Sequence, residues 1–374
     1  MTKTLNKYNN IPDTDTIHRE RISITKALGI ILMVLGHTRF STYGINFIYL
    51  FHMPLFFYLS GICFKDKYLN NTNIYIQRKI SNIYLPFVKW TLIFIILHNF
   101  FFQYNIINDK YGYLGSTSLP YPITEILKHI LKAILQMSCN EQLLGGFWFL
   151  HTIFFSYFIF YAIVFFNSKK SIIKTWSLLS LLLIFCIFCM YYNIHFKWLN
   201  IGYREFLAAS FMFTGYMTKI NNYLLSTKTI FWGIMLLCIV SLIMPVNMLT
   251  LQWYHIIPFF LVATLGSMII YSISYKLALS LNNYLKSFLI YTSNHTLEIL
   301  ALHFLSFKIV SYLIIMIEKR PIYELATHPV LTPTEHTYYL NLWWLAYFII
   351  GITFPLLYCT IKNHIEFIIT KRYK

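Results

Sequence analysis

About nine long apolar runs constrain the fold of this chain more than any other feature of its sequence. A helix of about 20 mostly apolar residues is long enough to cross the hydrocarbon core of a bilayer. The runs lie at roughly 22–41, 44–64, 83–104, 144–167, 172–192, 230–246, 252–275, 286–316 and 340–361. A tenth run, shorter and less apolar, lies at about 204–219. The pattern predicts an all-α polytopic integral membrane protein.

The composition agrees with this class and excludes others. Hydrophobic residues make up 57% of the chain and charged residues only 11%, against about 25% charged residues in an ordinary soluble domain. This excludes a disordered chain and a normal soluble enzyme. The net charge of +17 does not predict a nucleic-acid partner, because the basic residues are scattered between apolar runs rather than gathered on one polar face.

Loop charges predict the orientation in the membrane, because Lys and Arg accumulate in cytoplasmic loops. With ten spans and both termini inside, most Lys and Arg fall in the inside segments. Omitting the weak run at 204–219 inverts every later loop and removes this bias. We therefore expect about ten transmembrane helices and two long outside loops, at about 105–143 and 318–339. These loops either form the mouth of a site or simply connect helices.

The remaining segments give the domain organisation. Residues 1–20 are polar and lack the apolar stretch of a cleaved signal peptide, so we expect a cytoplasmic tail there. One membrane domain follows at 21–365, and a basic cytoplasmic tail is expected at 366–374. No internal repeat is visible at a fixed period, and no inverted halves of the kind found in many transporters.

Two ionisable residues share the first apolar run, where a charge is costly and usually marks a site. Lys26 and His37 are eleven residues apart, so a helix turns about 1100° between them and both lie on one face, about 16 Å apart along the axis. This spacing suits a long anionic ligand with phosphates at Lys26 and its reactive end at His37. Histidine is also the natural general base near neutral pH. The alternatives are a lysine that reaches the inner surface and a hydrogen-bonded core histidine.

A second polar cluster lies in the run at 286–316. Glu298 is one helical turn from His295, and His303 is expected to continue roughly the same face. A carboxylate at membrane depth must be paired or protonated. Glu298 either orients a catalytic imidazole, as a triad acid does, or is a structural partner of His295 or Lys308.

Two residues at predicted outer helix ends are candidates for binding an acceptor. Arg204 opens the run at 204–219 and either holds a hydroxylated or acidic molecule or anchors the helix at the interface. Trp148 begins the run at 144–167, where tryptophan is common in any membrane protein. The sequence has no Walker loop, no H-E-x-x-H helix and no G-x-S-x-G elbow, and we expect no metal.

Five segments in order resemble a known family. They are KALGIILMVLGH (26–37), FHMPLFFYLSGICF (51–64), RKISNIYLPF (78–87), GFWFLHTIFF (146–155) and YTSNHTLEILALHF (291–304). Together they resemble the membrane acyltransferases called acyltransferase type three, over about residues 20–365. The closest branch is similar to the fucose 4-O-acetylase-like proteins of surface-polysaccharide gene clusters.

The resemblance implies ten spans, a cytoplasmic acyl-CoA donor and O-acylation of a glycan on the far side of the membrane. The family's motif of a basic residue ten positions before a histidine falls on Lys26 and His37, with His37 catalytic. Its basic pair before a proline falls on Arg78 and Lys79. The chain departs from the pattern at Ile83, where many members have a second arginine. The other family positions are Phe147 to Leu150, the Leu302-His303 pair and His151, which stands where proline is frequent.

These observations predict an O-acetyltransferase of the bacterial inner membrane, which moves acetyl from cytoplasmic acetyl-CoA to a surface glycan or its lipid-linked unit. His37 is the base or a transient acyl carrier, with Glu298 assisting, and membrane lipid surrounds the chain. The predicted donor-binding residues are Lys26, Arg78 and Lys79, and the predicted acceptor pocket contains Trp148, His52, Arg204, His295 and His303. The alternatives are a glycan transporter or flippase, and the same fold transferring another acyl group such as succinyl.

Overall fold

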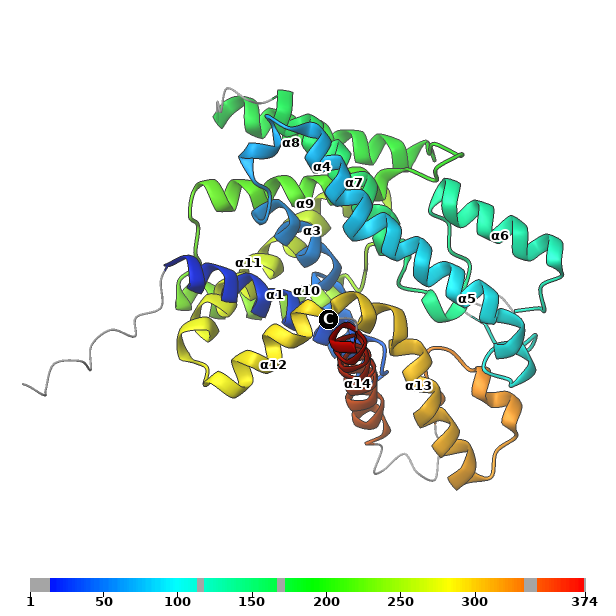
Figure 1. The fold of residues 1–374 in the computed structure, drawn as a ribbon. Coiled ribbons are helices and arrows are strands. Elements are labelled where there is room, and N and C mark those ends of the chain that lie inside the picture. The colour runs from blue at the N-terminus through cyan, green and yellow to red at the C-terminus, as the bar shows by residue number, and fades with distance from the viewer. Residues whose placement is uncertain (1–13, 113–117, 167–171, 333–341, 373–374) are drawn as a thin grey trace, which may run out of the picture.

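The computed structural model describes residues 14–112, 118–166, 172–332 and 342–372. Within these ranges the chain is helical and forms no strand beyond one isolated bridge between Phe196 and Ile201. The helices are α1 (Thr14–Gly36), α2 (Thr42–Tyr49), α3 (His52–Ile62), α4 (Thr72–Lys79), α5 (Leu85–Gln103), α6 (Ile123–Gln136), α7 (Trp148–Phe166), α8 (Ile172–Tyr191), α9 (Tyr203–Ile220), α10 (Thr227–Ile243), α11 (Ile256–Ser280), α12 (Asn283–Asn294), α13 (Thr296–Glu318) and α14 (Trp343–Arg372). They pack as one bundle (Figure 1).

The predicted all-helical membrane character is confirmed. Six helical segments among the described residues are long and apolar enough to cross a bilayer. They are Thr42–Ile62, Thr72–Gln103, Trp148–Phe166, Trp253–Ser280, Thr296–Glu318 and Trp343–Lys371. The shorter apolar helices Trp176–Tyr191 and Thr227–Ile243 lie in two more of the predicted runs, and α1 and α9 occupy the remaining two. The count of ten spans and the cytoplasmic termini stay predictions.

One predicted span is wrong in its extent. The apolar run at 286–316 is not one helix, because the chain bends at His295, whose φ of −114° and ψ of 25° are not helical. The short helix α12 precedes the bend and the spanning helix α13 begins at Thr296. The bend lies in the polar stretch from Thr292 to Thr296, whose Thr, Ser and Asn side chains can bond to the backbone in place of the helical hydrogen bonds. At the ends of the chain, helical structure extends into both predicted tails, from Thr14 and as far as Arg372.

The weak run at 204–219 forms α9, a helix in the middle of the bundle. Its residues from Leu207 to Phe213 are all buried, so the helix meets other helices rather than lipid and has no need of high hydropathy. Gly215 faces the backbone of Tyr58 on α3, and Gly61 of α3 faces the backbone of Met212. Small residues let two helix backbones approach closely inside a membrane, and this pair of glycines holds α3 against α9.

Replacing Gly215 with alanine is therefore expected to destabilise the protein by about 1–3 kcal/mol or more, the usual cost of overpacking a core. The added Cβ would lie 1.9 Å from the Tyr58 carbonyl oxygen, which belongs to rigid helix backbone. The measurement is the midpoint of thermal unfolding of the purified protein in detergent. Gly202→Ala is the matched control, because its Cβ would meet no atom closer than 3.5 Å. Equal midpoints for the two variants would contradict the close α3–α9 contact.

Segments expected on the same side of the membrane contact one another. On the predicted inside, Lys286 pairs with Glu20 at 2.9 Å. On the predicted outside, the side-chain amide of Asn108 donates to the Tyr323 carbonyl at 2.8 Å, and that of Gln142 donates to the Ala326 carbonyl at 3.2 Å. The described parts of the two long loops therefore contact each other.

The first of these loops contains an amphipathic helix, where the sequence predicts only a loop. Helix α6 lies alongside α5 at one edge of the bundle (Figure 1). Ile123, Leu127, Leu131 and Leu135 recur every four residues along α6, and all four are exposed. An apolar stripe of this kind is typical of a helix that lies in the membrane interface.

Candidate active site

His37 lies just beyond the last residue of α1, and Tyr49 at the end of α2 holds its ring. The Tyr49 hydroxyl donates to the Gly36 carbonyl at 3.0 Å and lies 3.2 Å from Nδ1 of His37. Because a hydroxyl has one hydrogen and a carbonyl only accepts, the consistent assignment has His37 Nδ1–H donating to the Tyr49 oxygen. The Nε2 atom of His37 then carries the free lone pair, as a general base requires.

Two more histidines surround this ring and have the same tautomer. The His303 ring stacks on His37 with centroids 5.5 Å apart. Its Nδ1 lies 3.0 Å from the carbonyl oxygens of Ile299 and Leu300, to which it can only donate. Nδ1 of His52 likewise donates to the Ile48 carbonyl at 3.0 Å. The site therefore has imidazole nitrogens that accept protons, and among the described residues no carboxylate pairs with His37.

A mostly apolar cavity of about 290 Å³ opens beside His37. We call it the His37 cavity. Its walls come from α1, α2, α3, α13, the start of α7 and the loop at 247–250, and they include Tyr49, His52 and Trp148. His303 is fully buried behind Phe304, whose ring faces the cavity. This places three of the predicted pocket residues, His52, Trp148 and His303, in the immediate surroundings of His37.

A second cavity of about 300 Å³ contains Lys26, and we call it the Lys26 cavity. Met33, Met53 and Leu300 line both cavities, which therefore lie end to end. Lys26, Ile30 and Met33 of α1 and His37 just after it line them, and this spacing is one face of a helix. The shared face that the sequence predicts for Lys26 and His37 therefore lines both cavities, and we call the two cavities together the passage.

Basic side chains gather at the Lys26 end of the passage. Lys26, Lys65, Lys79 and Lys219 all lie within electrostatic reach of Cys63, which lines the Lys26 cavity. This arrangement provides positive charge for a polyanionic group.

The two neighbouring basic residues of the predicted donor site differ in position. The Lys79 ammonium lies 3.2 Å from the ring centroid of Tyr157, a residue that lines the Lys26 cavity. Arg78 is exposed and donates from Nη1 to the Tyr68 hydroxyl at 2.9 Å. Lys79 is therefore the member of the pair that approaches the cavity.

Glu298 and His295 do not join the His37 site. Glu298 lies 3.8 Å from His295 Nδ1 and lines a different hollow, beside Lys89 and Lys362. The expectation that His303 shares this face is wrong, because the five residues from Glu298 to His303 turn the helix by about 500°, which leaves them about 140° apart. The side chain that hydrogen-bonds to His37 is Tyr49 rather than Glu298.

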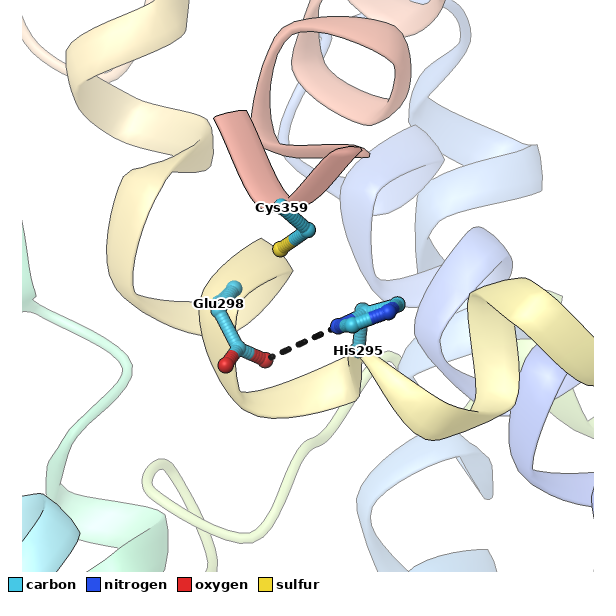
Figure 2. Close-up of side chains that lie close together, drawn as sticks. All are labelled: His295, Glu298 and Cys359. Atoms are coloured by element: carbon cyan, nitrogen blue, oxygen red, sulfur yellow. Dashed lines mark ion pairs between the residues drawn. The ribbon is translucent and has the colours of Figure 1, made fainter. Parts of the chain in front are cut away.

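Figure 2 shows His295 and Glu298 facing Cys359 of α14. Their ligand atoms lie within 4.8 Å of one another, close enough to hold a metal ion. The absence of a metal, which the sequence analysis expects, stays a prediction. The role of Glu298 in catalysis also stays a prediction, but no contact with His37 supports it.

The residues that sequence reasoning missed have no local signal. Tyr49 is one of 30 tyrosines in the chain, and nothing in its surroundings marks it as the partner of His37. Met33, Met53 and Leu300 read as ordinary apolar residues, and only their position at the junction of two cavities distinguishes them.

Comparison with known proteins gives one match. The family model described as an acyltransferase domain, the third of its type, matches residues 19–362. This range contains the Lys26 cavity, the His37 cavity and every predicted site residue. No curated protein matches the chain, and no solved structure does.

Proposed function

Because the chain belongs to this type-three family of membrane acyltransferases, we propose that it is an acetyl-CoA-dependent O-acetyltransferase. The acceptor is a hydroxyl of a bacterial surface glycan or of its lipid-linked unit. The donor enters from the cytoplasm, the acceptor from the opposite face, and the protein resides in the cytoplasmic membrane. Both termini lie inside in this scheme.

The observation that carries the proposal is the passage along α1. It has lysines at one end and an imidazole with a free Nε2 at the other. A CoA thioester has matching chemistry, with phosphates at one end of a long flexible arm and the reactive carbonyl at the other. Lys26 and Lys79 would hold the phosphates by charge-assisted contacts, and the arm would pass Met33, Met53 and Leu300.

The proposed reaction needs one base and no metal. His37 Nε2 takes the proton from the acceptor hydroxyl while the oxygen attacks the thioester carbonyl. The C–O bond forms and the C–S bond breaks. His37 returns the proton to the sulfur of CoA, which leaves as the free thiol. Tyr49 keeps Nδ1 protonated and the ring in place, as an orienting residue does in other imidazole catalysts. The alternative route has His37 Nε2 attack the thioester itself and carry the acetyl group to the acceptor.

The family match favours this function over the glycan transporter or flippase that the sequence alone leaves open. A transporter would also not need Lys26 in one cavity and His37 in the adjoining one. Transfer of another acyl group, such as succinyl, stays the main alternative within the same fold. Acetyl is favoured because the apolar lining of the His37 cavity suits the small acetyl group better than a carboxylated one.

The test is an acyl-transfer assay with purified protein in nanodiscs. Acetyl-CoA and succinyl-CoA are supplied separately with surface glycan from cells that lack this protein. We expect release of free CoA thiol with acetyl-CoA, and a glycan mass increase of one acetyl group per modified sugar. Absence of thiol release with every acyl-CoA offered would overturn the proposal.

The donor site gives a further prediction. Lys79→Ala is expected to raise the KM for acetyl-CoA about tenfold, with a smaller fall in kcat, because phosphate contacts serve ground state and transition state alike. Arg78→Ala is the matched neighbour and should change KM less than threefold, since Arg78 is exposed and bonded to Tyr68. Steady-state kinetics with varied acetyl-CoA measures both. Equal effects of the two changes would argue against Lys79 as the phosphate ligand.

A further inference from the structure

A second hollow, of about 200 Å³, lies next to the His37 cavity on the predicted outer side. We call it the Trp198 hollow. Trp148 lines both the Trp198 hollow and the His37 cavity. The other walls include Lys197, Trp198 and Arg204. A molecule in the Trp198 hollow therefore contacts the tryptophan that also borders the site of His37.

The Trp198 hollow is positively charged. Lys197 and Arg204 both line it, and its lining contains no Asp or Glu among the described residues. Neither cation forms an ion pair in the part of the chain that the structure describes. The thiol of Cys139, which also lines the hollow, stays neutral because burial raises its pKa to about 12.

The nearest carboxylate in sequence, Glu205, is already satisfied by other donors. It accepts from Thr152 Oγ1 at 2.8 Å and from the Gly202 N–H at 2.7 Å, and it faces Nδ1 of His151 at 3.4 Å. Glu205 is fully buried, so it does not project into the hollow. Arg204 lines the hollow and forms no ion pair with Glu205 among the described residues, so its guanidinium can bind an anionic group there.

The rest of the lining has the chemistry of a sugar site. Trp148 and Trp198 offer flat apolar faces, and Trp198 is 58% exposed. Asn140 and Asn200 add amide groups that bond to hydroxyls. Indole faces with a few polar groups bind a pyranose ring, and a guanidinium recognises a carboxylate or phosphate through paired hydrogen bonds.

We propose that the Trp198 hollow is an acceptor subsite for a sugar residue that carries a negative charge, so that an adjacent hydroxyl reaches His37. The inference rests on the proposed function and adds the class of acceptor. A carboxylate on the sugar and the diphosphate of a lipid carrier both offer anionic oxygens. The mostly polar pocket with two indole faces favours the charge on the sugar ring.

The experiment compares three acceptors. They are an oligosaccharide with uronic acid residues, the same oligosaccharide with its carboxyl groups reduced to alcohols, and a neutral sugar linked to a polyprenyl diphosphate. Wild-type protein should use the acidic oligosaccharide with a KM about 10–100-fold below that of its reduced form, the range for loss of a charge-assisted hydrogen bond. Preference for the neutral diphosphate-linked sugar, or equal use of all three, would overturn the proposal.

Substitutions test whether the two cations of the Trp198 hollow bind the charge of the acceptor. Lys197→Met and Arg204→Met should each raise the KM for the acidic acceptor about tenfold and leave the KM for the reduced acceptor and for acetyl-CoA unchanged. Arg204→Lys should restore part of the affinity. Lys128→Met removes an exposed charge from α6, outside the lining of the hollow, and controls for the general field. An equal loss in Lys128→Met would contradict a specific subsite.

A binding measurement separates this inference from the proposed function. Quenching of tryptophan fluorescence reports the acidic oligosaccharide in the hollow without any transfer, and Trp198→Phe identifies the signal. Binding of the acidic but not the reduced oligosaccharide supports the subsite even if thiol release from acetyl-CoA fails. Thiol release with no binding preference supports the acyltransferase and overturns the subsite.

Discussion

Replacing His37 with alanine is expected to lower the rate of acetyl transfer by about 10²–10⁴-fold, the usual contribution of a general base. The structure gives the reason, since Nδ1 of His37 is held by the Tyr49 hydroxyl and its other nitrogen is left as an acceptor beside the cavity. The measurement is the initial rate of glycan acetylation at saturating acetyl-CoA, with protein amount normalised by immunoblot. The KM for acetyl-CoA should change little, because the proposed phosphate contacts are at Lys26 and Lys79 rather than at His37.

Two companions make this prediction specific. Tyr49→Phe removes only the hydroxyl that receives the Nδ1 proton, so we expect a fall in kcat of about 10–100-fold with KM unchanged, the size found when an orienting partner is lost. Rapid denaturation at neutral pH after mixing with radiolabelled acetyl-CoA tests the acyl-histidine route, in which label stays on the wild-type protein, is released by brief acid treatment and is absent from the His37 variant. Full acetylation by His37→Ala would remove the imidazole from the mechanism.

Most of the fold could be predicted from hydropathy, because lipid imposes the same length and composition on every span that faces it. The exceptions have physical causes. Helix α9 is weakly apolar because it faces other helices, so its short apolar run predicts a span only together with the charge bias of the loops. Hydropathy does not predict the bend at His295, because apolar residues continue on both sides of the short polar stretch there and hydropathy does not report φ and ψ.

The site could be predicted in part. Lys26 and His37 share one helix, so helical periodicity alone places both on the face that lines the passage. Glu298 and His303 also share one helix, but their spacing is not a multiple of the helical repeat, and they separate. Contacts between separate segments could not be predicted from the sequence. Examples are the bond between Tyr49 and His37 and the shared hollow of Lys197 and Arg204, which depend on packing that no local pattern encodes.

Three apolar side chains lie at the junction between the two cavities, and in the proposed mechanism acetyl transfer depends on them. Met33, Met53 and Leu300 line both cavities, so a donor anchored near Lys26 must pass them for its thioester to reach His37. In the proposed mechanism their role is to leave room for the arm of the donor. A methionine suits this task because its unbranched chain adapts to what passes beside it.

Replacing Met33 with tryptophan is therefore expected to lower acetyl transfer at least about 100-fold, an effect near 2.7 kcal/mol on the barrier, while CoA still binds near Lys26. Met33→Ala at the same position widens the junction and should keep activity within about fivefold of wild type, well under the 1.4 kcal/mol that a tenfold change represents. Transfer rates and CoA binding are measured on the same preparations, with the midpoint of thermal unfolding as a check on folding. If the tryptophan variant folds, binds CoA and transfers acetyl at the wild-type rate, the donor does not reach His37 through this junction, and the two cavities serve separate molecules.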